Sequence, residues 1–162
     1  MIIATTIAQV RAQVAAWKKE GLTVGLVPTM GYLHEGHASL VDEAVRQCDR
    51  VVASDFVNPT QFGPNEDLEA YPRDFDRDCA LLEEHGCAMV FHPAVEEMYA
   101  PGAATYVEIL SDMPKQLCGK TRPIHFRGVC TVVSKLFNIV TPDKAFFGQK
   151  DAQQLAIIRQ MV

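Results

Sequence analysis

The sequence predicts an α/β fold of the Rossmann-like, doubly wound kind, in which a mainly parallel sheet carries helices on both faces. Short apolar runs typical of buried strands alternate with longer segments whose apolar residues recur at helical spacing. Strands that are almost continuously apolar are typical of parallel sheets covered on both sides. The 162 residues suit one domain, residues 1–162, that can bury a sizeable core.

The first half of the chain predicts helix, strand, helix, strand, loop and helix in succession. Thr5 or Thr6 can cap the first helix, Gly21 can end it, and Gly86 can end the last helix of this half. Runs rich in Val and Ala predict the strands, apolar residues at helical spacing predict the second helix, and Asn, Pro and Gly predict the loop. After the first helix, these elements are expected at residues 23–27, 38–49, 50–57, 58–72 and 74–85.

The second half predicts strand, short helix, strand, loop, helix, strand and helix, and its loop contains two prolines and two glycines. These elements are expected at residues 88–92, 94–99, 105–110, 111–128, 129–140, 144–147 and 151–162. Leu155, Ile158 and Met161 continue an apolar stripe to the end without a Gly, Asn or Pro stop signal. We therefore expect the chain to be one part of a longer protein.

The composition restricts the class of protein. A net charge of -5 argues against a nucleic-acid or acidic-membrane surface, and no apolar run approaches the ~20 residues of a membrane span. The N-terminus lacks the basic region of a secretory signal. The five cysteines form no C-x-x-C pair and are Cys48, Cys79, Cys87, Cys118 and Cys130. We expect a cytoplasmic protein with free thiols that binds neither nucleic acid nor membranes.

A turn between the first strand and the second helix carries two histidines. Residues 28–37 read Pro-Thr-Met-Gly-Tyr-Leu-His-Glu-Gly-His, with Gly36 between His34 and His37. A helix N-terminus offers unpaired N–H groups and a partial positive charge, so this turn can hold an anion. The absence of a side chain at Gly36 leaves room for a phosphate, and histidines can donate hydrogen bonds to it. We favour a nucleotide-phosphate site over a zinc site, which needs further ligands, and over buried structural histidines.

A second polar segment follows the strand expected at residues 50–57. In residues 56–63, Asn58 and Gln61 offer both hydrogen-bond donors and acceptors, which suits a hydroxy or carboxylate ligand. The alternative is that the Asn-Pro pair simply builds a turn, and this segment alone favours that alternative.

A third segment, residues 147–154, repeats the succession of strand, glycine and helix start. Here Lys150 could neutralise phosphate charge, and Asp151 could cap the helix or help to hold Mg²⁺. Gln154 also fits a capping arrangement with Asp151, so its position has a structural explanation as well.

Two groups of charged residues have structural explanations that we favour. A cationic loop is expected to pair with surface carboxylates, although it could meet an anionic substrate; it contains Arg122, His125 and Arg127. An acidic group is expected to be a solvated helix start, although one member could bind Mg²⁺; it contains Glu66, Asp67, Asp74, Asp76 and Asp78.

Taken together, these segments resemble the pantoate–β-alanine ligases, the AMP-forming family of pantothenate synthetases. The resemblance extends over essentially the whole chain, and its motifs occur in the family's order. The motifs lie at residues 27–37, 56–63, 66–68, 71–73, 125–129 and 150–154. A His-x-x-His signature alone is less specific, because nucleotidyltransferases and class I aminoacyl-tRNA synthetases share it.

The resemblance implies a ligase that condenses pantoate with β-alanine at the expense of ATP. The carboxylate of pantoate would attack the α-phosphate of Mg-ATP, giving pantoyl adenylate and pyrophosphate. The amine of β-alanine would then attack the adenylate, giving pantothenate and AMP. The resemblance also implies a homodimer, and a smaller C-terminal lid domain with a Lys-Met-Ser-like loop that this chain lacks. We therefore expect little activity from the chain alone.

By the same resemblance, three residues would act on the phosphates during catalysis: His34, His37 and Lys150. The residues implied to bind ATP are Met30, Gly31, Tyr32, Leu33, His34, Glu35, Gly36, His37, Gly148, Gln149, Lys150 and Asp151. Gln61 and Gln154 would bind pantoate from opposite sides, with Gln61 near β-alanine. Independently of the resemblance, Asp151 is the residue that we expect to help to hold Mg²⁺.

Two residues depart from the family pattern. Gln149 stands where Glu is common, and Asp55 interrupts a strand that is usually apolar. Two other functions remain open at this point. One is a nucleotidyltransferase acting on another acid, and the other is a fragment that binds ATP and pantoate and dimerises without turnover.

Overall fold

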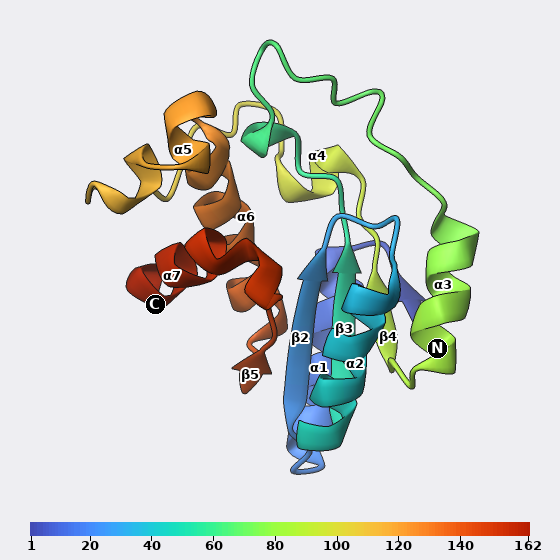
Figure 1. The fold of residues 1–162 in the computed structure, drawn as a ribbon. Helices are drawn as coiled ribbons and strands as arrows, with labels where there is room; N and C mark the ends of the chain where they lie inside the picture. Colours follow the sequence, from blue (N-terminus) through green and yellow to red (C-terminus); the bar gives the residue numbers. More distant parts are fainter.

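The computed structural model describes residues 1–162 and has a five-stranded sheet at its centre (Figure 1). The strands are β1 (Ile2–Ala4), β2 (Val24–Thr29), β3 (Arg50–Asp55), β4 (Met89–Phe91) and β5 (Lys144–Ala145). Their order is β1-β4-β3-β2-β5, and every neighbouring pair is parallel. The chain moves outward from β2 to β3 and β4, and then crosses to β5 on the other side of β2. The switch in strand order therefore lies beside β2, where ligands bind in open α/β sheets.

Seven α-helices surround the sheet, together with three short 3₁₀ turns. The helices are α1 (Ile7–Lys19), α2 (Glu35–Gln47), α3 (Phe75–Glu84), α4 (Val95–Met98), α5 (Cys118–Thr121), α6 (His125–Val140) and α7 (Ala152–Met161). The 3₁₀ turns are η1 (Pro59–Gln61), η2 (Met113–Lys115) and η3 (Gln149–Asp151). The chain between η1 and α3 arches above the C-terminal ends of the strands (Figure 1). No helix is both long and apolar enough to cross a membrane.

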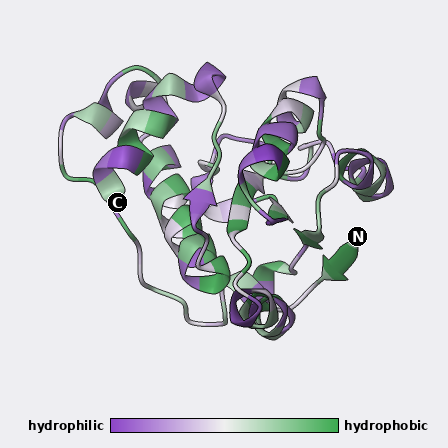
Figure 2. Cartoon of the chain, turned by 90° about the horizontal axis from the view of Figure 1, so that it is seen from below, coloured by the Kyte–Doolittle hydropathy of each residue, from purple (hydrophilic) through white to green (hydrophobic).

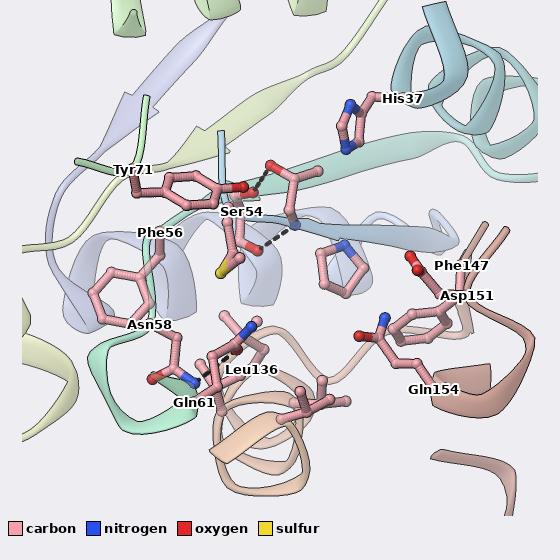
Figure 3. A pocket seen from close by; sticks show the side chains of 16 residues that line it. His37, Ser54, Phe56, Asn58, Gln61, Tyr71, Leu136, Phe147, Asp151 and Gln154 are labelled. Carbon is pink, nitrogen blue, oxygen red and sulfur yellow. Dashed lines mark hydrogen bonds between the residues drawn. The ribbon is translucent and has the colours of Figure 1, made fainter. Parts of the chain in front are cut away.

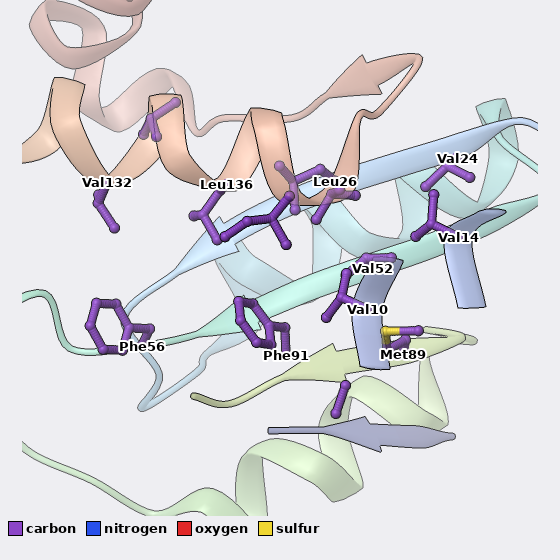
Figure 4. Close-up of a cluster of buried hydrophobic side chains, with 14 of the residues drawn as sticks. Val10, Val14, Val24, Leu26, Val52, Phe56, Met89, Phe91, Val132 and Leu136 are labelled. Carbon is purple, nitrogen blue, oxygen red and sulfur yellow. The ribbon is translucent and has the colours of Figure 1, made fainter. Parts of the chain in front are cut away.

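Helices cover both faces of the sheet, so the doubly wound α/β fold is confirmed. On one face, α1 and α6 pack on the strands, and Figure 4 shows this cluster. Its labelled residues are Val10, Val14, Val24, Leu26, Val52, Phe56, Met89, Phe91, Val132 and Leu136. On the other face, α2 and α3 cover a second cluster around Val41 and Leu82. Hydrophobic residues gather where helices meet the sheet, and hydrophilic residues face outward (Figure 2).

Most expected elements are present, but their starts shift. Thr6 caps α1 through a reciprocal capping box with Gln9, as its position before the apolar stripe predicts. Helix α2 begins at Glu35, before the expected residue 38, because the His34 side chain accepts the Gly36 N–H and caps the helix. Helix α6 begins at His125, before the expected residue 129. Glycine marks loops in a sequence, yet Gly128 lies in the first turn of this helix.

Three expectations about chain segments were wrong. The strand β1 was missed because its three residues are too few to show a periodic pattern. The strand expected at residues 105–110 is extended chain without a neighbouring strand, and its main polar contact joins the Val107 N–H to Thr131 of α6. The loop expected at residues 111–128 contains η2, α5 and the start of α6.

Candidate functional site

Two adjoining cavities open at the C-terminal ends of β2, β3 and β5. The small cavity, about 210 Å³, lies between β2, η1 and α6, and the large cavity, about 840 Å³, lies between the α2 N-terminus and η3. Five residues line both cavities: Pro28, His37, Phe147, Asp151 and Gln154. Because these residues form a common wall, ligands in the two cavities would meet at this junction. The site coincides with the switch in strand order beside β2.

The histidine turn presents two ring nitrogens to the large cavity. The Gly36 N–H donates to His34 Nδ1 at 2.9 Å, and the His34 N–H donates to His37 Nδ1 at 3.2 Å. A backbone N–H can only donate, so both Nδ1 atoms are acceptors. In the neutral rings the hydrogen must therefore sit on Nε2. The backbone thus fixes the tautomers and leaves two Nε2–H donors for a ligand.

The charge state of His37 favours the neutral ring. Burial lowers the pKa of His37, and nearby His34 lowers it further, while the carboxylates of Asp78 and Asp151 act in the opposite direction. The two rings lie 4.2 Å apart between centroids. A neutral His37 ring at the N-terminus of α2 can donate to phosphoryl oxygens without burying a cation. The anion-site interpretation of the turn therefore agrees with its geometry.

The second turn places a cation and a carboxylate on the opposite side of the large cavity. Lys150 and Asp151 lie in η3 and line this cavity together with Gly148 and Gln149. The Asp151 side chain does not cap α7, although it stands at the N-cap position. The capping arrangement with Gln154, which the sequence left open, is therefore not made, and the Asp151 carboxylate is free to meet a ligand.

Gln61 enters the small cavity with a fixed hydrogen-bonding polarity. The Asn58 side-chain oxygen accepts the Thr60 N–H and the Tyr99 hydroxyl, the latter at 2.7 Å. Its Nδ2 donates to the Gly128 carbonyl at 3.1 Å and to Gln61 Oε1 at 3.0 Å. Because a carbonyl only accepts and an N–H only donates, Asn58 cannot flip. Gln61 must therefore turn Oε1 toward Asn58 and keep Nε2 as a donor.

The rest of the small cavity joins an apolar wall to a second amide. The residues of α6 that form the wall are Val129, Val132, Val133 and Leu136. Gln61 and Gln154 approach the cavity from different elements, and Figure 3 shows their amide groups on opposite sides of the open space. Asn58 builds the η1 turn, as the structural interpretation of this segment predicts, and it also orients Gln61.

The residues of the cationic loop stabilise the surroundings of the site, but they line neither the small nor the large cavity. Arg122 pairs with Glu66 across two loops, and Arg127 stacks on Tyr106 with its guanidinium carbon 4.3 Å from the ring centroid. His125 Nδ1 donates to the main-chain carbonyl of Gln61 at 3.2 Å. The favoured pairing with carboxylates is therefore present for Arg122, while His125 contacts the backbone of the predicted ligand-binding residue.

Comparison with known proteins identifies the family. The family model described as pantoate-beta-alanine ligase matches residues 2–162. The chain belongs to the pantoate-beta-alanine ligase family. Pantothenate synthetases of Enterococcus faecalis and Thermotoga petrophila are 60% and 59% identical to it over 162 residues. These matches cover 100% of the chain but 57% and 58% of the relatives, so the chain spans a little more than half of their length.

Solved structures of pantoate-beta-alanine ligases share the fold. Pantothenate synthetase from Thermus thermophilus superimposes with a TM-score of 0.93 at 50% identity, covering 100% of this chain and 57% of that one. The Francisella tularensis pantoate-beta-alanine ligase, described as a complex with beta-gamma ATP and beta-alanine, gives a TM-score of 0.94 at 40% identity. That match covers 100% of this chain and 62% of the other.

The structure brings most residues of the predicted ligase site together and separates a few. The large cavity is lined by His34, Gly36, His37, Gly148, Gln149, Lys150, Asp151 and Gln154. Met30 and Gln61 line the small cavity. Leu33 is buried in the core, Glu35 is exposed and lines neither cavity, and Gly31 and Tyr32 face a third cavity behind the turn. These last four residues therefore line neither of the two adjoining cavities.

Several residues of the site were not found from the sequence. Asp78, interpreted as part of a helix start, accepts hydrogen bonds from the histidine turn, and Tyr99 and Gly128 support Asn58. Each acts across a long separation in the chain, so no local spacing marks it. Asp78 lies in the first turn of α3 beside Asp76, where acidic residues are common, so the sequence pattern gave no signal that distinguished it.

Proposed function

We propose that the full-length protein condenses pantoate with β-alanine in an ATP-dependent reaction through pantoyl adenylate, releasing AMP and pyrophosphate. The family and the described complex of a relative with beta-gamma ATP and beta-alanine support this proposal. The observation that carries it is the common wall between a cavity suited to phosphates and a cavity suited to a branched hydroxy acid. Two reactants held across such a junction gain a large advantage from proximity and orientation.

The nucleotide occupies the large cavity in this proposal. His34 and His37 donate from Nε2 to the phosphates, and Lys150 adds a positive charge from the facing turn. Adenylation develops negative charge on the α-phosphate and on the departing pyrophosphate. Fixed donors that do not have to reorient are therefore the main catalytic resource of the domain.

Pantoate occupies the small cavity. Its two methyl groups lie against the apolar wall of α6, and its oxygen atoms face the amides of Gln61 and Gln154. Gln61 is held as a donor, so it binds an oxygen of the acid and leaves the amine of β-alanine to another partner. The carboxylate of pantoate would then lie at the common wall, within reach of the α-phosphate. Closure around the mixed anhydride would protect it from water.

Magnesium would enter with the nucleotide. No group of three His, Cys, Asp or Glu side chains is arranged to hold a metal ion by itself. Mg²⁺ is usually bound by one or two carboxylates together with substrate phosphates, and Asp151 supplies one free carboxylate at the common wall. The donor set therefore fits a phosphate-bound Mg²⁺, which would draw charge from the phosphoryl oxygens. We propose Asp151 as its protein ligand.

The reaction predicts a pantoate-dependent exchange of pyrophosphate into ATP. With the full-length protein, labelled pyrophosphate should enter ATP only when pantoate is present, because only the first step is reversed in that assay. β-Alanine alone should give no exchange. Exchange at the same rate without pantoate would contradict the proposal and favour a nucleotidyltransferase that uses another acceptor.

We also propose that two copies of the chain associate through the extended segment 103–110. Leu110 is 82% exposed, and the N–H groups of Glu108, Ile109 and Leu110 make no hydrogen bond within the chain. An extended segment with free N–H groups and apolar side chains can pair with the same segment of a second copy. Such pairing about a two-fold axis would satisfy both copies at once.

Replacing Leu110 with Asp should weaken this dimer by at least 100-fold. Burial of one leucine contributes about 2 kcal/mol, and a two-fold interface contains the residue twice. Sedimentation equilibrium over a range of protein concentrations would give the dissociation constant. Val95→Asp is a matched control, because Val95 is an exposed valine in the first turn of α4, outside the segment. A wild-type chain that stays monomeric at high concentration would contradict the dimer.

A further inference from the structure

We propose that Asp78 is a positioning residue for the histidine turn and that it does so by sharing a proton with Asp55. This inference rests on the proposed function only where it concerns nucleotide binding. Neither residue lines the small or the large cavity. Both face the third cavity, about 270 Å³, which lies behind the turn.

Asp78 holds the two peptide groups that lead into His34. It is only 1% exposed on α3, and its Oδ2 accepts the Tyr32 N–H at 2.8 Å. Its Oδ1 accepts the Leu33 N–H at 2.7 Å. Tyr32 has a φ of 50°, a conformation that a non-glycine residue keeps only when its surroundings hold it. Asp78 therefore stabilises the backbone that aims the histidine rings at the large cavity.

Asp55 brings a second carboxyl group to the same place. It ends β3, and its side chain is 7% exposed. A Cβ atom at Gly31 would lie 2.4 Å from Asp55 Oδ1 and 3.2 Å from Asp78 Oδ2. The two carboxyl groups thus converge above Gly31, where only glycine leaves room for them.

One oxygen of Asp55 has no partner unless it carries a proton. Its Oδ2 is buried and accepts no hydrogen bond from the protein. A buried carboxylate oxygen without a donor is unfavourable, and a second carboxylate beside it adds repulsion. If Asp55 is protonated, its carboxyl O–H can donate a hydrogen bond to the Asp78 carboxylate. The buried oxygen then has a partner, and the repulsion between two carboxylates is removed. Asp78 then keeps its charge, which strengthens its bonds to the turn.

The other charged and titratable groups around the pair do not replace this proton. Directly after β4, His92 Nδ1 donates to the Asp55 main-chain carbonyl at 2.8 Å and lies 3.8 Å from the Asp55 carboxyl. The chain before α3 contributes Tyr71, Arg73 and the N-cap residue Asp74, and α3 itself contributes Arg77 and Cys79. None of these groups forms an ion pair with Asp55 at less than the distance of His92.

The shared proton makes the turn sensitive to pH near neutrality. Burial is the main cause that raises the pKa of Asp55 to about 7, and the neighbouring Asp78 adds to it. An unfolded Asp titrates near 3.8. Between these values the folded chain binds more protons than the unfolded chain, so its stability falls as the pH rises toward 7 and then levels off. Above that range the pair carries two charges, and the turn is held less firmly.

Asp55→Asn tests the pair directly. The asparagine amide can donate to Asp78 at any pH, so the variant should melt at a higher temperature than the wild type. We expect a difference near zero at pH 4 that grows to roughly 10 °C at pH 8. Asp76→Asn is the matched control, because it removes an exposed acid from the first turn of α3 without touching the pair. A constant difference across this range would overturn the shared proton.

The pH dependence of the Tyr32 and Leu33 amide resonances, measured by nuclear magnetic resonance, distinguishes a shared proton from a purely structural role of Asp78. A purely structural role would give no titration of these resonances near neutral pH. Both amide resonances should titrate with a midpoint near the Asp55 pKa of about 7 in the wild type and in Asp76→Asn. The same titration should be lost in Asp55→Asn. This readout needs no nucleotide, so it stands even if the proposed function fails. Amide resonances that are flat in the wild type would contradict the inference.

Nucleotide affinity tests the consequence for binding. Between pH 6.5 and 8.5 the dissociation constant for Mg-ATP should rise roughly threefold more in the wild type than in Asp55→Asn. Titration of ATP itself affects both proteins equally and cancels in this ratio. Asp78→Asn should weaken ATP binding at least tenfold at every pH, because one of the two acceptors for the turn is lost. If neither protein binds ATP, the proposed function fails, while the melting and resonance tests still decide the pair.

Discussion

Replacing His37 with alanine should lower the pantoate-dependent exchange of pyrophosphate into ATP by about 100- to 1,000-fold. Loss of one preorganised donor to a developing negative charge has an effect of this size in other enzymes. His37 lines both cavities, and its Nε2 is held as a donor by the bond from the His34 N–H to Nδ1. The variant should keep its fold, because the ring is only half-buried and His34 still accepts the Gly36 N–H at the start of α2, although the reciprocal bond to His37 is lost.

The pH dependence of the exchange rate shows whether His37 acts as a neutral hydrogen-bond donor or as a cation. The pKa of His37 lies below its ordinary value, so the ring is neutral at pH 7 and stays neutral as the pH rises. The contribution of His37, measured as the wild-type to His37→Ala rate ratio, should therefore not fall between pH 7 and 8.5. His85→Ala is the control, because His85 pairs with Asp42 on the surface away from both cavities. A ratio that collapses above pH 7 would assign the role to the imidazolium.

The elements of the fold that the sequence predicted are those with long and regular patterns. The alternation of apolar runs with helical stripes identified four of the five strands, among them the central pair β2 and β3. Three residues such as Ile2–Ala4 cannot show a period, and this strand becomes recognisable only when it pairs with β4. The segment 105–110 has a strand-like composition, but no other strand of the chain pairs with it in the fold. Pairing partners are properties of the fold, so neither result could be read from local pattern.

The same distinction applies to the candidate site. His34, Lys150 and Gln154 follow predicted strands, and the parallel topology carries them to one edge of the sheet. The sequence could not predict the residues that hold these side chains in position. Asp78 reaches the turn across more than 40 residues, and Gly128 meets Gln61 across more than 60. These contacts depend on how α3 and α6 lie against the sheet.

Gly128→Ala should destabilise the protein even though it replaces glycine inside a helix. On helix propensity alone, alanine would stabilise α6 by about 0.5–1 kcal/mol. A Cβ atom at this position, however, would lie 2.5 Å from the Gln61 N and Cα atoms and from the Thr60 carbonyl oxygen. These are backbone atoms, so η1 must move as a unit. We expect a net loss of about 1–3 kcal/mol, and a melting temperature lower by roughly 3–10 °C.

The movement of η1 should also weaken ligand binding, because the close contact with Gly128 holds Gln61 in its position at the small cavity. Its carbonyl accepts from Asn58, and Asn58 in turn fixes the donor polarity of Gln61. A shift of about 1 Å in a positioning group can change a rate by 100-fold, so the KM for pantoate should rise at least tenfold while that for ATP changes little. Asn138→Ala, at an exposed site of the same helix, should leave both constants unchanged. A stabilised Gly128→Ala protein with normal pantoate kinetics would mean that η1 adjusts freely, and that the polarity of Gln61 does not depend on its seat against α6.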